Sequence, residues 1–424
     1  MSKSSRIAGF YRLSPEERLR LVREFAGLSD EEVEILRSTG ALKLEQANRM
    51  IENVVGTLEL PLGIAVNFLI NGKDYLVPMA IEEPSVIAAA SNAARMARER
   101  GGFTASSDEP LMIGQVQLTD VGDLLKAKEA ILSNQEGILR VANEQDPTLV
   151  RLGGGAKGLE VRMLDTEEGE MLVVHLLVDV RDAMGANAVN AMCEAVAPLL
   201  EELTGGKAYL RIISNLATCR LARAEAVFAK EVLGGEKVVD GIVKAYALAA
   251  ADPYRCATHN KGIMNGIIAV ALATGNDTRA LEAGAHAYAA MGGGYRPLTA
   301  WRRTDEGDLW GMIELPLAVG IVGGATASNP VAKVCLKILG VRSARELAEV
   351  MASVGLAQNL AALRALVAEG IRRGHMKLHA RNLAIMAGAT GELIDRVAER
   401  MVVEGRISFD RAREVLGEFL RGGG

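Results

Sequence analysis

Apolar and polar residues follow different patterns in successive parts of the chain. Residues 14–37 predict two short helices, because each helix begins with a serine placed three residues before a glutamate, the capping-box pattern. Residues 64–81 alternate with the two-residue period of a β-hairpin, and Asn71-Gly72 suits its turn. An alanine-rich helix is then expected to begin at Pro84, since proline is favoured at a first helical position.

Between about residues 111 and 215, short apolar strands alternate with helical segments. The expected strands are 112–118, 159–164, 171–180 and 208–213, and the expected helices are 122–143 and 187–203. This mixture predicts a separate α+β module inserted between two largely helical parts. From about residue 375 onward, short charged helices predict a small C-terminal piece.

The composition narrows the class of protein. A chain of 424 residues should form two or three domains, since a single core rarely exceeds about 250–300 residues. Hydrophobic residues make up 49% and charged residues 24%, an ordinary globular balance, and the net charge of −5 argues against nucleic acid as the main partner. The N-terminus lacks a signal-peptide core, and the longest apolar stretch, 309–322, is shorter than the roughly 18–20 residues of a membrane span. We therefore expect a cytoplasmic enzyme without membrane or nucleic-acid partners.

The segment Thr258-His-Asn-Lys-Gly-Ile-Met-Asn-Gly266 carries the strongest chemical signal. Lys261 is expected just before or within the first turn of a helix over 262–274, with Asn265 on the same face. A desolvated lysine beside amide donors can stabilise an oxyanion, although a lone lysine also suits a surface or phosphate-binding role. Asp277 follows the helix end, roughly 24 Å from Lys261 at about 1.5 Å per residue. Direct coupling of the two therefore requires a helix break or a second subunit.

Glu83 and His375 are candidates for proton transfer. Glu83 precedes a proline at a helix entry, where the helix dipole favours the carboxylate, so proton donation would need burial or a nearby anion. A simple capping role is the alternative. His375 stands beside Gly374, which suits a histidine that swings in as a donor.

A metal site is the competing interpretation of the histidines. His375 and His379 have the i, i+4 spacing of metal ligands, but no third ligand is evident nearby. The four cysteines match no zinc-ligand spacing and are expected to be free thiols. We expect no metal, and a zinc hydrolase stays as an alternative that chelators would test.

The best candidate for a dinucleotide site is Asp182-Ala-Met-Gly-Ala-Asn187, between an expected strand and the helix after it. Its small residues allow close backbone approach, and the helix N-terminus offers N–H groups to a pyrophosphate. The glycine-rich stretch 153–158 is rejected, because a strand follows it whereas the dinucleotide fingerprint opens a helix.

Five segments in this order resemble the class II 3-hydroxy-3-methylglutaryl-CoA (HMG-CoA) reductases: Glu52-Asn-Val-Val-Gly-Thr, Glu82-Glu-Pro-Ser, Asp182-Ala-Met-Gly-Ala-Asn, the lysine segment, and Gly355-Leu-Ala-Gln-Asn. The resemblance runs from about residue 10 to 415. It implies an α+β multidomain fold with a large, mostly helical CoA-binding and dimerisation domain, a small ferredoxin-like cofactor domain and a C-terminal helical flap. The implied bounds are 1–110 with 216–374, 111–215, and 375–424.

The resemblance also assigns roles to residues. Glu83, Lys261, Asp277 and His375 match the catalytic positions; Ser85, Asn215, Arg255, Asn265 and Gln358 match substrate contacts; and Asp182, Ala183, Met184, Gly185, Ala186 and Asn187 fall in the cofactor loop. At the N-terminus the chain has Tyr11-Arg12 where the best-known bacterial member has an arginine for the CoA tail.

Cofactor and assembly follow from the same resemblance. Asp146 matches a position that contacts the adenosine ribose, where a carboxylate bonds a 2′-hydroxyl and repels a 2′-phosphate, so NADH is expected over NADPH. A homodimer, or a larger assembly of dimers, is expected to form active sites at the subunit interface. The expected reaction interconverts HMG-CoA and mevalonate plus CoA by two hydride transfers. Mevalonate oxidation and a non-catalytic CoA-ester-binding protein are the alternatives.

Overall fold

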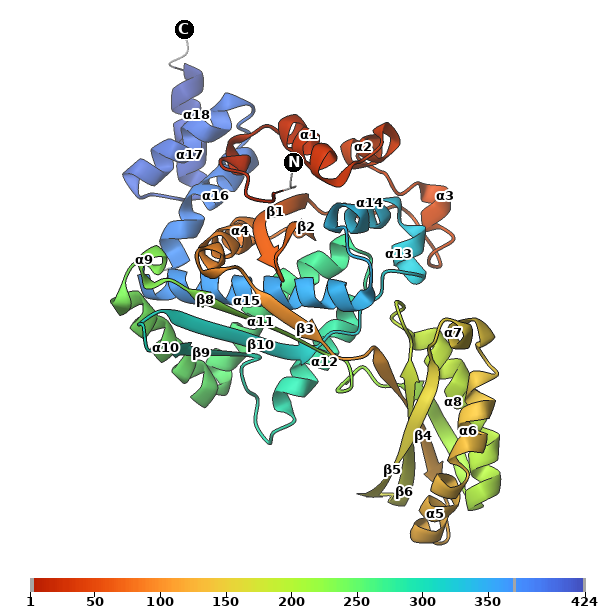
Figure 1. Cartoon of the computed structure of the whole chain (residues 1–424). Coiled ribbons are helices and arrows are strands. Elements are labelled where there is room, and N and C mark those ends of the chain that lie inside the picture. The colour runs from red at the N-terminus through yellow and green to blue at the C-terminus, as the bar shows by residue number, and fades with distance from the viewer. Residues whose placement is uncertain (1–3, 369–370, 422–424) are drawn as a thin grey trace.

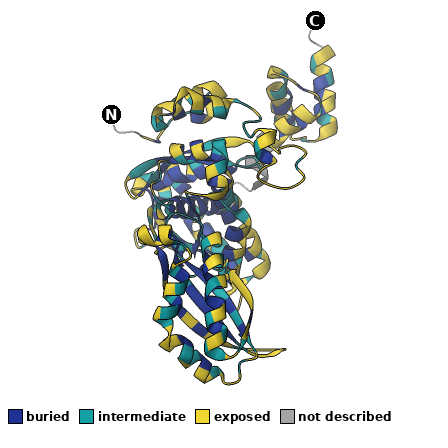
Figure 2. Ribbon diagram, turned by 90° about the vertical axis from the view of Figure 1, so that its right-hand side faces the viewer, coloured by how far each residue is buried: buried dark blue, intermediate teal, exposed yellow. Residues whose placement is uncertain are grey.

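The computed structural model describes residues 4–368 and 371–421, with residues 371–378 described by their backbone alone. The chain forms a large unit, a smaller α+β unit between β3 (Thr104–Ser107) and β8 (Leu221–Phe228), and a group of helices at the C-terminus (Figure 1). The mixed helix and strand class predicted from the sequence is confirmed. Buried residues fill the interior of the large unit and the helix-covered face of the small sheet (Figure 2).

The N-terminal elements form where the sequence predicts them. Helices α1 (Pro15–Ala26) and α2 (Asp30–Arg37) both begin with a complete capping box. Strands β1 (Leu62–Ile70) and β2 (Lys73–Ala80) pair antiparallel around Asn71-Gly72, both with positive φ, as a two-residue hairpin turn requires. The α1 and α2 helices pack with this hairpin and α14 in a small hydrophobic cluster of their own.

The remaining large-unit elements surround one long helix. They are η1 (Phe10–Arg12), α3 (Leu44–Ala47), α4 (Val86–Ala97), η2 (Arg98–Arg100), β3 (Thr104–Ser107), β8 (Leu221–Phe228), α9 (Lys230–Leu233), α10 (Glu236–Ala251), α11 (Pro253–Ala273), α12 (Thr278–Ala290), β9 (Thr299–Arg303), β10 (Leu309–Pro316), α13 (Gly324–Ser328), α14 (Pro330–Leu339) and α15 (Ala344–Ala368). The four strands form an antiparallel sheet in the order β3-β8-β10-β9.

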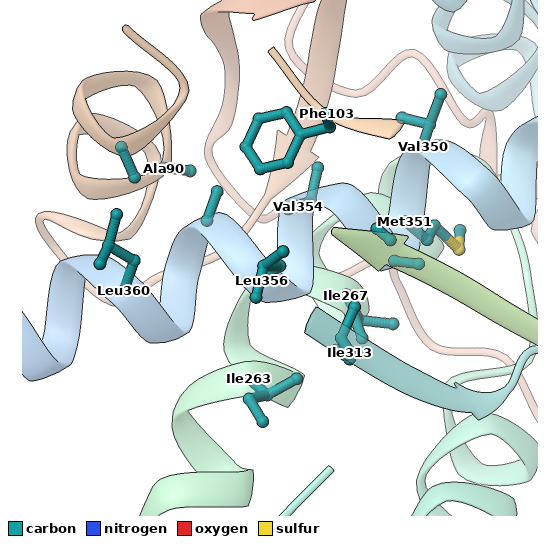
Figure 3. Close-up of a cluster of buried hydrophobic side chains, with 14 of the residues drawn as sticks. Ala90, Phe103, Ile263, Ile267, Ile313, Val350, Met351, Val354, Leu356 and Leu360 are labelled. Atoms are coloured by element: carbon teal, nitrogen blue, oxygen red, sulfur yellow. The ribbon is translucent and has the colours of Figure 1, made fainter. Parts of the chain in front are cut away.

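Helix α15 is the centre of the large core, where Val350, Val354 and Leu360 meet side chains from the sheet, α4 and α11 (Figure 3). Two glycines let α11 and α15 approach closely. A Cβ on Gly266 would lie 3.1 Å from Val354 and Gln358, and one on Gly355 would lie 2.8 Å from Ile267. Within the described ranges, α15 alone is long and apolar enough by composition to cross a membrane, and 67% of that window is buried inside the protein.

The small unit has its own hydrophobic cluster. Its elements are β4 (Leu111–Thr119), α5 (Leu124–Ser133), α6 (Gln135–Asn143), α7 (Pro147–Arg151), β5 (Gly155–Thr166), β6 (Gly169–Asp179), α8 (Ala186–Thr204) and β7 (Lys207–Ile213). The strands pair antiparallel in the order β5-β6-β4-β7, and α5, α6 and α8 pack together with them. All four predicted strands are confirmed, whereas the predicted helix 122–143 is two helices that meet at Asn134.

Helices α16 (Ile371–Met386), α17 (Glu392–Glu404) and α18 (Phe409–Arg421) end the chain. They pack on one another through a third hydrophobic cluster that includes Leu383, Met401 and Val415. In Figure 1 they lie at the far end of the large unit from the small one.

Candidate active site

Lys261 lies in the middle of α11 and not at its beginning. The helix starts at Pro253, because the Asp252 carboxylate accepts the N–H groups of Tyr254 and Arg255 and proline occupies the first helical position. The predicted start at Gly262 is therefore wrong by about two and a half turns. The Asp252-Pro253 pair was the local signal for the true start.

Three candidate residues meet on the exposed edge of α11. The ammonium of Lys261 lies 2.9 Å from Oε2 of Glu83, and the Asn265 amide donates to the same oxygen at 3.2 Å. Lys261 and Asn265 share this partner because they lie one helical turn apart. The side chains of Glu83 and Lys261 are 39% and 61% exposed, so a ligand can reach both.

Glu83 reaches α11 from the connection between β2 and α4. Helix α4 begins at Val86, not at Pro84, and Ser85 before it has a left-handed backbone with φ of 75°. A non-glycine residue in this region costs about 1–2 kcal/mol, so the surrounding structure must hold the turn. The turn leaves Glu83 and Ser85 half-buried, where they line a shared cavity.

This cavity has a volume of about 1130 Å³. It extends along the hairpin and α4 to the N-terminal segment, so Glu83 shares it with Arg6, Tyr11 and Arg18. Its lining is mostly apolar, with cationic side chains contributed by the N-terminal residues and by Arg95. The arrangement offers an elongated, partly apolar ligand a path toward the Glu83–Lys261 pair.

Asp277 lies beyond the C-terminal end of α11, where it caps the next helix, α12. Its carboxylate accepts the N–H groups of Arg279 and Ala280 and lies 3.2 Å from the Arg279 guanidinium. Helix α11 is unbroken from Lys261 to Ala273, roughly 18 Å at about 1.5 Å per residue, and the chain turns before Asp277. The structure thus brings together Glu83, Lys261 and Asn265 but leaves Asp277 apart.

The other substrate candidates lie in three places. Gln358 on α15 is buried against Gly266, and its Oε1 has no hydrogen-bond partner among the described residues. Arg255 is half-buried in the first turn of α11. Asn215 is exposed in the connection from β7 to β8, and its carbonyl packs against Gly284 of α12. Gln358 therefore lies beside Gly266 of α11, and Asn215 lies beside α12, the helix that Asp277 caps.

The His375 side chain lies outside the described residues; its backbone belongs to α16. His379, one turn further along, is exposed. In the part of the chain that the structure describes, no group of three or more His, Cys, Asp or Glu side chains could hold a metal ion.

The candidate cofactor loop, residues 182–187, joins β6 to α8. Gly185 caps α8 with φ of 98°, and no described side chain caps the first turn of this helix. The small residues of this loop and the uncapped N–H groups at the start of α8 suit a bound pyrophosphate. The Asp182 carboxylate accepts the N–H of Ala344 at 2.8 Å, which ties the loop to the start of α15.

Asp146 lies at the N-terminus of α7 in the same unit. Its carboxylate accepts the N–H of Leu149 at 2.9 Å and is half-buried. Asp146 therefore caps α7, and Pro147 stands at its first helical position. This pair is a helix-start signal that can be read from the sequence alone.

Sequence reasoning missed two buried polar residues near these sites. Arg220 is 5% exposed and donates to the cofactor loop, and His259 is 1% exposed and lies 2.7 Å from the Thr299 hydroxyl. Burial lowers the pKa of His259 to about 4, with Arg255 adding to the effect. No local pattern marks Arg220, because its partners lie far away along the chain.

A carboxylate–lysine–amide cluster lies beside a long cavity, and a small α+β unit offers an uncapped helix N-terminus. These features fit the class that comparisons with known proteins show, an oxidoreductase. The family model described as Hydroxymethylglutaryl-coenzyme A reductase matches residues 14–380. The chain belongs to the HMG-CoA reductase family.

Relatives in sequence agree. The 3-hydroxy-3-methylglutaryl-coenzyme A reductase of Archaeoglobus fulgidus is 67% identical over 413 residues, covering 97% of this chain and 94% of its own length. A probable reductase of Borreliella burgdorferi is 37% identical over 380 residues, covering 87% and 86%.

A solved reductase structure from Streptococcus pneumoniae superposes with a TM-score of 0.84 at 42% identity, covering 97% of this chain and 99% of that one. A second, described as the class II enzyme bound to NADPH in open conformations, gives a TM-score of 0.82 at 43% identity, covering 96% and 100%. The predicted family and its class II fold are therefore confirmed.

Proposed function

We propose that this chain interconverts HMG-CoA and mevalonate plus CoA by two successive hydride transfers, with NADH as the favoured cofactor. The observation that carries the proposal is the convergence of Lys261 and Asn265 on Glu83 at the edge of the large cavity. A cation, an amide donor and a carboxylate within hydrogen-bond reach of one another are what reduction of a thioester carbonyl requires.

Lys261 is the oxyanion-stabilising residue in this scheme. Its ammonium would bind the carbonyl oxygen as negative charge develops there, first on the thioester and then on the aldehyde. Glu83 would supply the proton that this oxygen takes up. The Glu83 carboxylate pairs with the Lys261 ammonium at 2.9 Å, and the scheme needs a further carboxylate beside this pair. We assign that part to Asp277 of the partner subunit.

His375 is proposed to protonate the CoA thiolate as it leaves the hemithioacetal. This role rests on the resemblance and on the position of the histidine in α16, at the beginning of the C-terminal helices. Its variant His375→Gln should lose thioester reduction while retaining reduction of free mevaldehyde. Equal losses in both assays would remove the histidine from this role.

The large cavity is proposed to hold the CoA ester. Its volume of about 1130 Å³ exceeds a typical small-molecule pocket, as an extended CoA chain would need. Arg6, Arg18 and Arg95 supply positive charge for phosphate groups. Ser85 lines the same cavity next to Glu83, which supports its assignment to the hydroxymethylglutaryl part, with Asn265, Arg255 and Gln358 on the neighbouring helices.

The small unit is proposed to be the ferredoxin-like domain that binds the nicotinamide cofactor, which supplies each hydride when bound. The chain offers the uncapped N-terminus of α8 and the small residues of loop 182–187 to the pyrophosphate. Asp146 is proposed to bond the adenosine ribose and to repel a 2′-phosphate. The Streptococcus pneumoniae relative is described as bound to NADPH, so the preference of this chain needs its own measurement.

Each active site is proposed to combine two subunits of a homodimer. Within one chain, Lys261 pairs with Glu83, whereas Asp277 lies at the far end of α11 on the side of the cofactor loop. An exposed apolar segment supports a subunit interface, since Val55 is 100% and Leu58 92% exposed. Cytoplasmic location and the metal-free site remain predictions, and mevalonate oxidation remains the alternative direction of the same reaction.

The test is oxidation of NADH and of NADPH with HMG-CoA, with the free thiol counted against cofactor consumed. Two cofactor molecules oxidised per thiol, and faster turnover with NADH, are the expected results. CoA-ester binding without turnover would support the non-catalytic alternative instead. Asp146→Ala should bring the turnover rates with NADH and with NADPH closer together. An unchanged ratio of the two rates would show that Asp146 does not set the cofactor preference.

A further inference from the structure

Arg220 is a buried cation placed between the cofactor loop and the large unit. It stands just before β8, where the chain returns from the small unit, and is only 5% exposed. Its guanidinium donates to the carbonyl of Ala183 at 3.2 Å, to that of Met184 at 3.3 Å, and to that of Val319. Arg220 thus binds two consecutive peptide groups of loop 182–187 and one of the large unit.

The surrounding backbone fits closely around this contact. A Cβ on Gly320 would lie 2.6 Å from the N atom of Met184, so only glycine lets the two segments approach this closely. The N–H of Ile321 donates to the Asp182 carbonyl at 2.9 Å. Segment 317–321 therefore contacts one side of loop 182–187. A ligand can then approach the loop from the start of α8.

The charge of Arg220 has no paired carboxylate. Among the residues that the structure describes, none lies within ion-pair distance of it: Asp179 pairs with Arg181, and Asp182 accepts the N–H of Ala344. Burial lowers the pKa of Arg220 to about 10, opposed by Asp179 and Asp182, so the group stays cationic at neutral pH. An unpaired cation beneath an uncapped helix N-terminus adds to the positive potential that attracts a pyrophosphate.

The same segment connects the cofactor loop to Asp277. The N–H of Gly320 donates to the Asn276 side chain at 2.8 Å, and Asn276 immediately precedes Asp277. Asn276 in turn donates to the Thr274 hydroxyl at 3.0 Å. The segment that Arg220 binds at Val319 therefore also contacts Asn276 through Gly320. Residues 274–277 form the turn that leads to Asp277, here called the Asp277 turn.

We propose that Arg220 is a positioning residue of the cofactor site, which holds loop 182–187 and the Asp277 turn in one arrangement through the carbonyls of Ala183, Met184 and Val319. The inference rests on the proposed function, because it takes loop 182–187 as the pyrophosphate site. Arg220 does not touch the reacting atoms. Its loss should weaken cofactor binding without changing the CoA-ester cavity, which lies on the hairpin and α4.

The test compares Arg220→Met and Arg220→Lys with the wild-type chain. Dissociation constants for NADH and for HMG-CoA are measured separately by titration, together with KM for each and the thermal midpoint. Arg364→Met is the matched control, since Arg364 also donates to a carbonyl, that of Leu233, but in the large unit. Exchange of the backbone amides of residues 183–187 is followed by hydrogen exchange in the unliganded proteins.

Arg220→Met should raise the dissociation constant for NADH roughly tenfold to a hundredfold, as loss of charged hydrogen bonds implies, with HMG-CoA affinity within about twofold. Arg220→Lys keeps the charge and should restore part of the affinity. Arg364→Met, the control, should lower the thermal midpoint without changing the dissociation constant for NADH or for HMG-CoA. Should Arg220→Met not fold, Arg220→Lys must still show faster exchange at 183–187 and weaker NADH binding.

Two results separate the inference from the proposed function. NADH affinity equal to wild type in both Arg220 variants would overturn the positioning role while leaving the reductase intact. Parallel loss of NADH and HMG-CoA affinity would also overturn it, since that is the effect of general destabilisation. A wild-type chain that binds no nicotinamide cofactor would instead refute the proposed function itself.

Discussion

Lys261 and Glu83 are separated by 178 positions in sequence but lie 2.9 Å apart. The relation of Lys261 to Asn265 could be read from their four-residue spacing, because it is a property of a single helix. The partnership with Glu83 could not, since it depends on how the β2–α4 connection packs beside α11. The family resemblance places both residues among the catalytic positions, and the structure shows their contact.

Lys261→Met should reduce turnover by roughly a hundredfold to a thousandfold, the cost of losing one preorganised oxyanion donor. Substrate affinity should change much less, because the ammonium acts mainly on charge that develops in the transition state. Steady-state kinetics with saturating HMG-CoA measures the effect. Lys237→Met, an exposed lysine on α10, is the control and should retain full activity. Turnover within a few-fold of wild type in Lys261→Met would contradict the assignment.

His259 makes stability depend on pH. Its pKa falls from 6.5 to about 4 on folding, so between these values the unfolded chain binds a proton that the native protein does not. The free energy of unfolding that neutral His259 contributes is fully present above pH 6.5. It is lost as the pH falls toward 4, by up to about 3 kcal/mol. His259→Gln keeps a polar partner for Thr299 but cannot titrate. Urea unfolding from pH 7 to 4 should give it a flatter profile; identical slopes would contradict the account.

At the scale of elements, local sequence signals predicted the helix starts and the turn that depend on neighbouring residues alone. The two capping boxes and the Asn71-Gly72 turn were correct because each depends on neighbours within a few residues. The predicted starts of α4 and α11 were wrong for different reasons. Ser85 adopts a left-handed backbone that tertiary contacts impose, whereas the start of α11 has a local signal, Asp252-Pro253, several residues before the lysine segment.

Helix α8 offers a matched pair of glycines, one at each end. Gly185 and Gly205 both have positive φ, but a Cβ on Gly185 would lie 2.4 Å from Val180, whereas one on Gly205 meets nothing within 4 Å. Gly205→Ala should cost about 1 kcal/mol of unfolding free energy, the backbone penalty alone. Gly185→Ala should cost about 1–3 kcal/mol more, through overpacking.

Gly185→Ala should also weaken NADH binding, because the steric conflict displaces the loop that carries the proposed pyrophosphate site. Urea denaturation and cofactor titration of both variants make the measurement. Equal stability losses would show that Val180 moves aside freely. Unchanged NADH affinity in Gly185→Ala would place the cofactor elsewhere.

At the scale of the molecule, the mixed fold and the family were predictable, because five short segments in a fixed order are more specific than any one of them. The division into domains stays a prediction that the separate hydrophobic clusters support. The cavity and the contacts of Arg220 were beyond prediction, since both arise where segments remote in sequence meet. The distance along α11 did anticipate that one chain leaves Asp277 apart from Lys261.

The central claim is that each active site takes Glu83 and Lys261 from one subunit and Asp277 from the other. Co-expression of differently tagged Lys261→Met and Asp277→Asn chains, followed by purification through both tags, isolates the mixed dimer. One of its two sites then has every native residue, so its activity should be about half that of wild type, although each homodimer is inactive. The mixed dimer of Glu83→Gln with Lys261→Met should stay inactive, because both residues belong to one subunit. An inactive Lys261→Met with Asp277→Asn dimer would contradict the shared site.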